Sequence, residues 1–266
     1  MPDALASIYQ DRLRHLTEEM ARESLTELAD RARGRGGERR SLRDALRRGP
    51  APTVIAEIKR ASPSAGLIAP DFDPQAIALE YQQAGADAIS VLTEADHFQG
   101  QLSYLQLVRD RTSVPLLRKD FLTTEYEVVQ SAAYGADAIL AIVAGLTDQQ
   151  LAEVIGAARR WGVEVLVEVH SRGELERALA QGADLVGINN RDLKTLETDI
   201  SVTARLAADL PVGLAVVSES GFETAADIEC IYRLGVRSFL VGEALMRCPD
   251  KAAWMGSVKA LGAVEA

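Results

Sequence analysis

Cysteines and long apolar runs are scarce in this sequence. Its 266 residues include two cysteines, Cys230 and Cys248, and neither belongs to a CxxC pair. A disulfide framework is therefore not predicted, and we expect two buried, inert thiols. No stretch approaches the roughly 18 apolar residues that a membrane helix needs, and the first residues show no apolar core behind a basic start. We expect a cytoplasmic protein with no membrane partner.

Metal-binding residues are also few. The sequence contains no HExxH motif and no acidic cluster with the spacing of metal ligands, and its histidines, His15, His97 and His170, are isolated from one another. His170 adjoins a predicted strand, and we expect it at the surface or in a supporting position rather than in direct contact with a ligand. Neither a metal nor another cofactor is predicted.

Positive charge is outnumbered by negative charge. The chain has 29 Lys and Arg against 39 Asp and Glu, for a formal net charge of −10. Nucleic acid is not expected as a partner, because binding it requires clustered basic residues that neutralise phosphates. One segment, 31–48 (RARGRGGERRSLRDALRR), is basic. We interpret it as a solvated, mobile connection, and the alternative is a flap over an anionic ligand at the mouth of the site.

Hydrophobic residues make up 47% of the chain, enough for a large core. Apolar residues at near-helical spacing predict one helix over residues 3–30, and a shorter helix is predicted over residues 41–48. We treat residues 1–50 as an N-terminal helical extension and residues 51–266 as the main unit of a single domain.

Short apolar runs alternate with helical stretches after residue 50. One sequence pattern, in which a helix ends at glycine and a strand begins shortly after it, recurs about every 50 residues, which is roughly two strand–helix units. Its four copies are AGADAISVL, YGADAILAIV, QGADLVGIN and LGVRSFLVG. Such a pattern predicts an α/β fold, a closed (β/α)8 TIM barrel with an N-terminal helical extension. A doubly wound open sheet is the alternative, but no GxGxxG follows the first strand. The strands are predicted at 54–58, 88–92, 114–118, 138–143, 163–168, 184–189, 213–218 and 238–242.

Five of these runs end in charged or amide side chains. The carboxyl ends of the strands meet on one face of a barrel, so residues far apart in sequence become neighbours there. Removing ionisable groups from water costs several kcal/mol or so unless they pair or take part in chemistry. An active site is therefore predicted, with structural salt bridges as the alternative. The candidate residues are Glu57, Lys59, Lys119, Glu168, Asn189 and Glu219.

Local sequence suggests protonation properties for these groups. Glu57 and Lys59 are two residues apart, hence on the same side of a strand, where each can keep the other charged. Lys119 follows Arg118, so we expect a lowered pKa that suits it to donate a proton near neutral pH. Glu168 lies between two valines, so we expect its pKa to be raised.

Turns after the last strands predict a phosphate site. Barrels commonly bind phosphate with backbone N–H groups after strands seven and eight, and ordinary turn chemistry is the alternative reading of such glycines. Ser220 and Gly221 follow the seventh predicted strand, and Gly242 and Glu243 follow the eighth. Arg191, just past the sixth, adds a positive charge. Because the local field can be positive in an acidic protein, we expect a small phosphorylated carboxylate as the substrate.

Several motifs occur together and in order: AEIKRASPSAG at 56–66, SVLTE at 90–94, LRKDF at 117–121, LVEVH at 166–170, GINNRDL at 187–193, SESG at 218–221 and VGEALMR at 241–247. With them the chain resembles the indole-3-glycerol phosphate synthase family over about residues 50 to 250 and most of the extension. The resemblance implies a lyase of tryptophan biosynthesis. It would convert 1-(2-carboxyphenylamino)-1-deoxyribulose 5-phosphate to indole-3-glycerol phosphate with loss of CO2 and water. No cofactor or metal is implied, and we expect a monomer.

The resemblance also implies roles for individual residues. Lys119 matches the general acid that protonates the substrate carbonyl, and Glu168 matches a second acid/base residue that serves the loss of water. Lys59 would bind the carboxylate and assist dehydration, with Glu57 holding the lysines in place. Asn189 and Glu219 match residues that orient the substrate hydroxyls and the lysines. The positions that match substrate and phosphate binding are Ser62, Arg191, Ser220, Gly221, Gly242 and Glu243.

Four positions depart from the family's usual residues. His97 stands where an aromatic residue is common, Gln101 where a serine is common, Ala65 where lysine is usual and Ala132 where arginine is frequent. We expect these changes to affect the aromatic-ring pocket and the first loop rather than proton transfer. The alternatives are a paralogue acting on a related aminodeoxyribulose phosphate and a non-catalytic barrel that binds a sugar phosphate.

Overall fold

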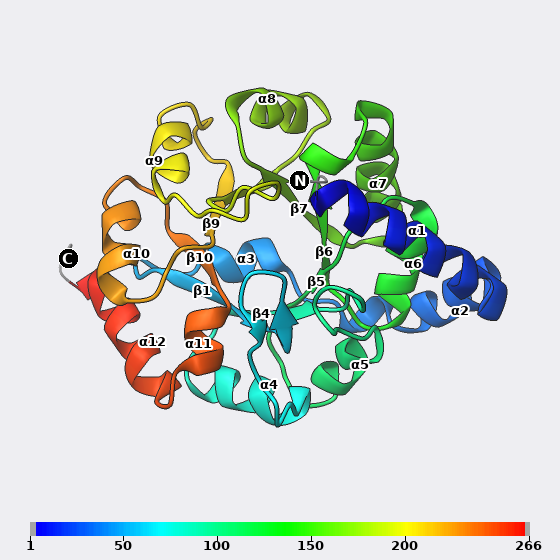
Figure 1. Ribbon diagram of the computed structural model, residues 1–266, viewed down its shortest axis with the longest axis horizontal. Coiled ribbons are helices and arrows are strands. Elements are labelled where there is room, and N and C mark those ends of the chain that lie inside the picture. The colour runs from blue at the N-terminus through cyan, green and yellow to red at the C-terminus, as the bar shows by residue number, and fades with distance from the viewer. Residues whose placement is uncertain (1–3, 264–266) are drawn as a thin grey trace.

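A closed barrel of parallel strands forms the centre of the computed structural model, which describes residues 4–263 (Figure 1). Around the barrel each strand pairs in parallel with both neighbours, and the last strand closes onto the first. The predicted (β/α)8 barrel is confirmed, and each strand lies within about two residues of its expected range. The barrel strands are β1 (Thr53–Ile58), β4 (Ala88–Leu92), β5 (Leu116–Lys119), β6 (Ala138–Ile142), β7 (Glu164–Val169), β8 (Leu185–Asn189), β9 (Ala215–Glu219) and β10 (Ser238–Val241).

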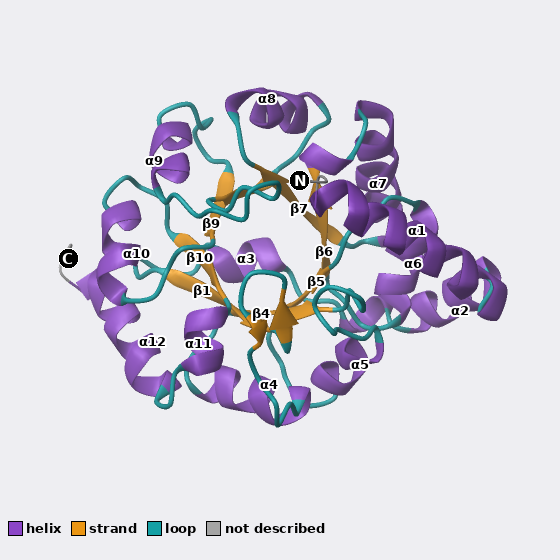
Figure 2. Ribbon diagram, in the orientation of Figure 1, coloured by secondary structure: helices purple, strands orange, loops and turns teal. Residues whose placement is uncertain are grey.

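Helices surround this ring of strands (Figure 2). Helices end at the glycines of the recurring pattern, as predicted. Gly85 and Gly135 have φ values of 96° and 91°, in the left-handed region that suits a residue without Cβ. None of the helices between residues 4 and 263 combines the length and apolar character needed to cross a membrane. The helices outside the strands are α4 (Pro74–Gln83), α5 (Ser103–Arg109), α6 (Glu125–Ala133), α7 (Asp148–Trp161), α8 (Arg172–Ala180), α9 (Ser201–Ala207), α10 (Ala225–Tyr232), α11 (Glu243–Arg247) and α12 (Lys251–Lys259).

Alternate residues of each strand point into the barrel. Leu117 of β5 and Leu166 of β7 belong to one buried apolar cluster that fills its interior. The next inward positions, two residues later, are Lys119 and Glu168. The interior is therefore apolar through its middle and becomes charged at the carboxyl ends of the strands.

The first part of the N-terminal extension forms two helices, not the single helix expected over residues 3–30. Helix α1 (Ala4–Arg22) ends before Ser24, and α2 (Leu25–Gly34) starts after it. The Ser24 hydroxyl accepts from the backbone N–H of Glu27 (3.3 Å), and the Glu27 carboxylate accepts from the backbone N–H of Ser24 (2.8 Å). This capping box starts a new helix, and the sequence Ser-Leu-Thr-Glu already contained its signal.

The basic segment 31–48 lies at the opposite end of the barrel from the mouth. Its helix α3 (Leu42–Leu46) places Leu42 and Leu46 against the bottom of the barrel interior. The Ser41 hydroxyl and the backbone N–H of Arg43 both donate to Glu164, the first residue of β7 (2.8 and 2.9 Å). Both expectations for this segment, a mobile connection and a flap over the mouth, were therefore wrong, because its leucines and backbone close the amino ends of the strands.

The expectation of two buried thiols was also wrong. Cys230, on α10, is exposed, and Cys248, after α11, is partly exposed. Both are free thiols, in agreement with the absence of a predicted disulfide framework.

A buried network of charges joins α1 to the outer side of the barrel next to Lys119. Arg12 of α1 is almost fully buried and binds both carboxylate oxygens of Glu19 (2.9 Å each), while its Nε lies 2.9 Å from Oε1 of Glu127 on α6. Arg118 of β5 is also buried, and its Nη2 binds Asp120 at 2.9 Å. The residues on either side of Lys119 are thereby held in the wall between β5, α6 and α1.

Replacing Arg12 by leucine should destabilise the protein strongly. The change leaves the buried Glu127 carboxylate without its ion pair, a defect worth about 3–5 kcal/mol. We expect that loss in the free energy of unfolding measured with urea. Arg22→Leu is the matched control, because Arg22 pairs with Glu18 on the exposed face of the same helix, and such pairs contribute about 0–1 kcal/mol. Equal losses for the two variants would show that the buried pair does not stabilise the extension.

Candidate active site

The carboxyl ends of the strands surround a cavity of about 970 Å3. Its wall draws on every barrel strand or the loop that follows it, together with the start of α1 and the hairpin of β2 (Ala61–Ser62) and β3 (Gly66–Leu67). Every site residue named from the sequence lines this cavity. They are Glu57, Lys59, Ser62, Lys119, Glu168, Asn189, Arg191, Glu219, Ser220, Gly221, Gly242 and Glu243.

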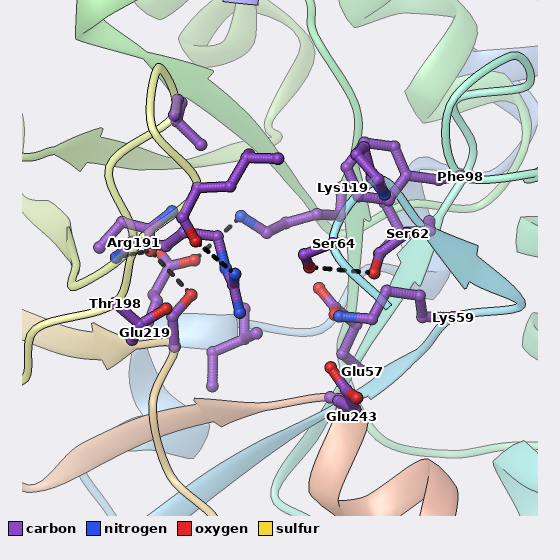
Figure 3. Close-up of a pocket in the computed structure, with 18 of the residues that line it drawn as sticks. Glu57, Lys59, Ser62, Ser64, Phe98, Lys119, Arg191, Thr198, Glu219 and Glu243 are labelled. Carbon is purple, nitrogen blue, oxygen red and sulfur yellow. Dashed lines mark hydrogen bonds and ion pairs between the residues drawn. The ribbon is translucent and has the colours of Figure 1, made fainter. Parts of the chain in front are cut away.

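Lys119 lies at the centre of the site, between two buried carboxylates. Its Nζ donates to Oε2 of Glu168 at 2.7 Å and to Oε2 of Glu219 at 2.9 Å. Figure 3 shows Lys119 reaching across the cavity, with Lys59, Ser62 and Phe98 on one side and Arg191 and Glu219 on the other. Three separate strands, β5, β7 and β9, thus supply one ammonium and two carboxylates to a single cluster.

The pKa of Lys119 is raised, and the expectation that it would be lowered was wrong. Burial acts to lower this pKa, but the negative charges of Glu168, Glu219 and Glu57 outweigh burial. Arg118 was expected to lower the pKa, but its guanidinium lies in the barrel wall on Asp120. Lys119 therefore carries its proton at neutral pH.

The two carboxylates that share Lys119 differ in pKa. Burial acts to raise the pKa of Glu168, yet the charges of Lys119 and His170 and the hydrogen bonds of Lys119 and Asn189 leave it lowered, against our expectation. Burial raises the pKa of Glu219 to about 7, because Lys119 opposes this only in part and the charges of Glu168 and Glu57 add to it. Oε1 of Glu219 is buried and has no hydrogen-bond partner among the described residues. The site thus combines an anionic glutamate with one that binds a proton near neutral pH.

Two glycines, one within β8 and one directly after β10, make room for the carboxylates. A Cβ at Gly187 of β8 would collide with Oε1 of Glu219, and a Cβ at Gly242 would collide with Oε1 of Glu57. Glu57 in turn pairs with Lys59, as predicted (Oε1–Nζ 2.8 Å). Gly187 belongs to the GINNRDL motif, but only the packing reveals that it accommodates a neighbouring side chain.

Asn189 connects the charged cluster to the turns expected to bind phosphate. Its Nδ2 donates to Oε1 of Glu168 at 3.1 Å. Its Oδ1 accepts from the Ser220 hydroxyl at 2.8 Å and from the backbone N–H of Arg191 at 3.0 Å. Ser220 and the adjacent Gly221 both have positive φ, 67° and 87°, so their turn is sharply bent beside the cavity.

Sequence reasoning missed the apolar wall of the cavity. Phe98, in the loop after β4, and Phe121, after β5, line it with ring centroids 6.1 Å apart. Leu5 and Ile8 of α1 add to this wall. Phe121 could have been identified from the LRKDF motif, but nothing in the sequence indicated that the first turns of α1 would reach the cavity.

The four departures from the family pattern lie in different environments. His97 lines the cavity, and its Nε2 lies 2.9 Å from Oδ2 of Asp11 on α1. Ala65 lies in the hairpin, and its backbone N–H donates to the Ser62 hydroxyl at 3.1 Å. Gln101 is exposed outside the lining, and Ala132 is buried in the core cluster that includes α2. The expectation that all four would touch the ring pocket or first loop therefore holds for His97 and Ala65 only.

This arrangement is suited to acid–base chemistry on an anionic molecule. An ammonium between two carboxylates of different pKa can donate a proton and recover one without solvent access. Between residues 4 and 263, no group of three or more His, Cys, Asp or Glu side chains is arranged to hold a metal ion. Lys59 and Arg191 supply positive charge on the two sides of the cavity (Figure 3).

Known proteins resemble this chain closely. A family model described as indole-3-glycerol phosphate synthase matches residues 5–258. A protein of that name from Azospirillum brasilense is 46% identical over 259 residues, covering 95% of this chain and 97% of its own. Another, from Dehalococcoides mccartyi, is 51% identical over 205 residues, covering 76% of this chain and 79% of its own.

Two solved structures match the fold at low sequence identity. The 3-hexulose-6-phosphate synthase of Salmonella typhimurium has a TM-score of 0.65 at 13% identity, covering 80% of this chain and 100% of its own. KGPDC from Streptococcus mutans has a TM-score of 0.62 at 11% identity, covering 80% of this chain and 98% of its own. At such identities the likeness concerns the barrel alone.

The raised pKa of Glu219 should make stability depend on pH. Because its pKa is about 7 in the folded protein against a usual 4.5, the native state keeps a proton that the unfolded chain releases. The stability of the wild type should therefore fall as pH rises through that window, and Glu219→Gln should not share this loss. Between pH 5 and 8, the unfolding free energy of Glu219→Gln should therefore rise relative to that of the wild type by up to about 3 kcal/mol.

Urea unfolding at several pH values measures this difference. Glu176→Gln is the control, since Glu176 is exposed on α8, and its difference from the wild type should stay constant over the same range. A pH-independent difference for Glu219→Gln would contradict the raised pKa.

Proposed function

This chain belongs to the indole-3-glycerol phosphate synthase family, and from that premise we propose how the residues of its cavity carry out the reaction. The enzyme converts 1-(2-carboxyphenylamino)-1-deoxyribulose 5-phosphate to indole-3-glycerol phosphate, with loss of CO2 and water, in tryptophan biosynthesis. It is therefore a decarboxylating carbon–carbon lyase. The assignment of individual residues to steps is our proposal.

The substrate lies across the cavity between two anion-binding regions. Its aromatic ring contacts Phe98 and Phe121, and its carboxylate is bound by Lys59. Its phosphate meets the Arg191 side chain and the backbone of the turns after β9 and β10, with Ser62 as a further polar contact. Glu243 contributes through its backbone, because its carboxylate is paired with Arg247 (Oε1–Nε 3.0 Å). Fixing both ends holds the ring carbon against the carbonyl carbon in a geometry close to attack.

Ring closure needs an acid at the substrate carbonyl. The ring carbon that carries the carboxylate attacks the carbonyl carbon, and Lys119 transfers a proton to the oxygen. The bond to the carboxylate then breaks, CO2 leaves, and the electron pair restores the aromatic ring. Positioned proton transfer of this kind contributes roughly 10²- to 10⁴-fold. The raised pKa of Lys119 suits this role because the group is fully protonated before the reaction.

Dehydration needs an acid and a base. Lys59 protonates the new hydroxyl so that it leaves as water, while Glu168 removes a proton from the neighbouring CH2 carbon and the indole double bond forms. Two protons are delivered to the departing oxygen and one is taken from carbon, so the carboxylate form of the substrate consumes one proton from solvent. Glu168 can return its proton to Lys119, which lies 2.7 Å away.

The other predicted residues hold these groups in place. Glu57 keeps Lys59 charged, Glu219 binds Lys119 from the side opposite Glu168, and Asn189 orients both Glu168 and the substrate hydroxyls. The observation that carries the assignment is the position of Lys119, bound to two carboxylates midway between the anion-binding regions. We further propose a cytoplasmic monomer that needs no metal or other cofactor and has no nucleic-acid or membrane partner.

The assigned activity predicts turnover without added metal. Purified protein mixed with the carboxyphenylamino-deoxyribulose phosphate should form indole-3-glycerol phosphate, followed by ultraviolet absorbance or fluorescence, at a rate unchanged by EDTA. Inhibition by EDTA that Mg²⁺ or Zn²⁺ reverses would contradict a reaction driven by lysine acids. Binding of the substrate without turnover would favour a paralogue, and His97 would be the first cavity residue to exchange.

Lys119→Ala should abolish turnover while leaving anion binding intact. Loss of the acid should lower kcat by about 10²- to 10⁴-fold, whereas inorganic phosphate should bind as in the wild type by calorimetry because Arg191 and the turns remain. Lys259→Ala is the control, since Lys259 binds Asp87 and the Pro52 carbonyl outside the cavity. A Lys119→Ala variant with normal kcat would overturn the assignment of the acid.

A further inference from the structure

His170 occupies a partly buried position next to Glu168. It follows the last residue of β7, is mostly shielded from solvent, and is not among the residues that line the cavity. None of the steps above uses it. Its ring nevertheless lies between two carboxylates, one inside the proposed catalytic cluster and one on α8.

The two ring nitrogens face different glutamates. Nδ1 lies 3.2 Å from Oε2 of Glu174, and the backbone N–H of His170 donates to the same oxygen at 2.8 Å. Nε2 lies 3.4 Å from Oε1 of Glu168, is buried, and has no hydrogen-bond partner among the described residues. Glu174 thus orients the ring, and the free edge of the ring points at Glu168.

Only the imidazolium form suits this position. A neutral imidazole has one N–H, so it would turn a lone pair toward one of the two carboxylates, whereas the cation donates from both nitrogens. Burial acts to lower the pKa of His170, but the hydrogen bond to Glu174 and the charges of Glu168, Glu174 and Glu219 leave it raised. Asp192, in the loop after β8, also interacts with the ring through its charge. Every one of these neighbours is acidic and favours the charged ring.

The cation also balances the charge of the site. Glu57, Glu168 and Glu219 are buried beside Lys59 and Lys119, so once Glu219 is ionised, above its pKa of about 7, three carboxylates face two ammonium groups. A third cation behind Glu168 offsets the remaining negative charge without occupying space that the substrate needs. It also leaves Oε2 of Glu168 to Lys119, because the ring approaches Oε1.

We propose that His170 is a positioning residue for Glu168, acting as an imidazolium clamped by Glu174 that keeps the Glu168 carboxylate anionic and turned toward the reacting atoms. The proposal rests on the role of Glu168 as the base of the dehydration. His170 touches no substrate atom and transfers no proton to it. Its contribution is electrostatic, since a cation within about 4–6 Å lowers a carboxyl pKa by roughly 1–3 units.

The protonation state of His170 can be read directly by NMR. The chain has three histidines, so single substitutions assign the imidazole nitrogens in long-range ¹H–¹⁵N spectra. Both nitrogens of His170 should still carry protons at pH values above 6.5, the usual pKa of a histidine, and Glu174→Gln should lower the pKa of His170. A neutral His170 ring throughout that range would overturn the proposal without any measurement of turnover.

The pH profile of kcat/KM tests the effect on Glu168. In His170→Asn the pKa of Glu168 should rise, so the acidic limb of the profile should shift to higher pH by about one unit. At a given pH on that limb, kcat/KM should be about tenfold lower than in the wild type. Glu174→Gln should move the limb in the same direction by less. The double variant should not exceed His170→Asn, because both changes remove the same cation. His15→Asn, which alters a histidine paired with Asp96 outside the lining (Nε2–Oδ2 3.3 Å), is the matched control.

Two outcomes separate this proposal from the role of Glu168. If Glu168→Gln retains full turnover, the assignment of the base fails and the positioning role fails with it. If Glu168→Gln abolishes turnover but His170→Asn keeps the wild-type limb, only the role of His170 fails. A lowered kcat/KM with an unmoved limb and a lower unfolding free energy would assign His170 to stability alone and would also overturn the proposal.

Discussion

The site depends on one ammonium shared by two carboxylates. Lys119 binds Glu168 and Glu219 deep in the barrel, where neither carboxylate is accessible to water. Two carboxylates brought this close in a buried space need a cation between them, and even with that cation the pKa of Glu219 is raised to about 7 while Glu168 stays anionic. The other features of the site follow from this constraint. Gly187 leaves room for Glu219, and Asn189 satisfies the second oxygen of Glu168.

The extension completes the barrel at both ends. Helix α3 covers the bottom with leucines, and the cavity lies at the carboxyl ends of the strands. Helix α1 borders the cavity with Leu5 and Ile8, while Arg12 on the same helix is anchored to α6 behind β5. One helix therefore contributes both to the wall of the cavity and to the support of the strand that carries Lys119.

Errors in the sequence-based pKa expectations have a common cause. Arg118 and Lys119 are adjacent in sequence, but successive side chains of a strand point to opposite faces, so Arg118 lies in the barrel wall and does not repel Lys119. Glu168 has apolar neighbours along its strand, but its pKa responds to Lys119 and His170 across space. A pKa is set by three-dimensional neighbours, which the linear order of a strand does not reveal.

The sequence by itself determined the barrel, the ranges of its strands and the identity of the polar residues at their ends, because these depend on local periodicity and on the short turns between elements. The motifs in order also identified the family. Only the tertiary structure decided that Glu168 and Glu219 share Lys119 and which glycine makes room for Glu219. It also decided that α1 reaches the cavity while the basic segment closes the opposite end. Each of these is a contact between segments that are distant in the chain. Closure of the barrel and packing of the extension determine which atoms meet there, and the local sequence pattern does not.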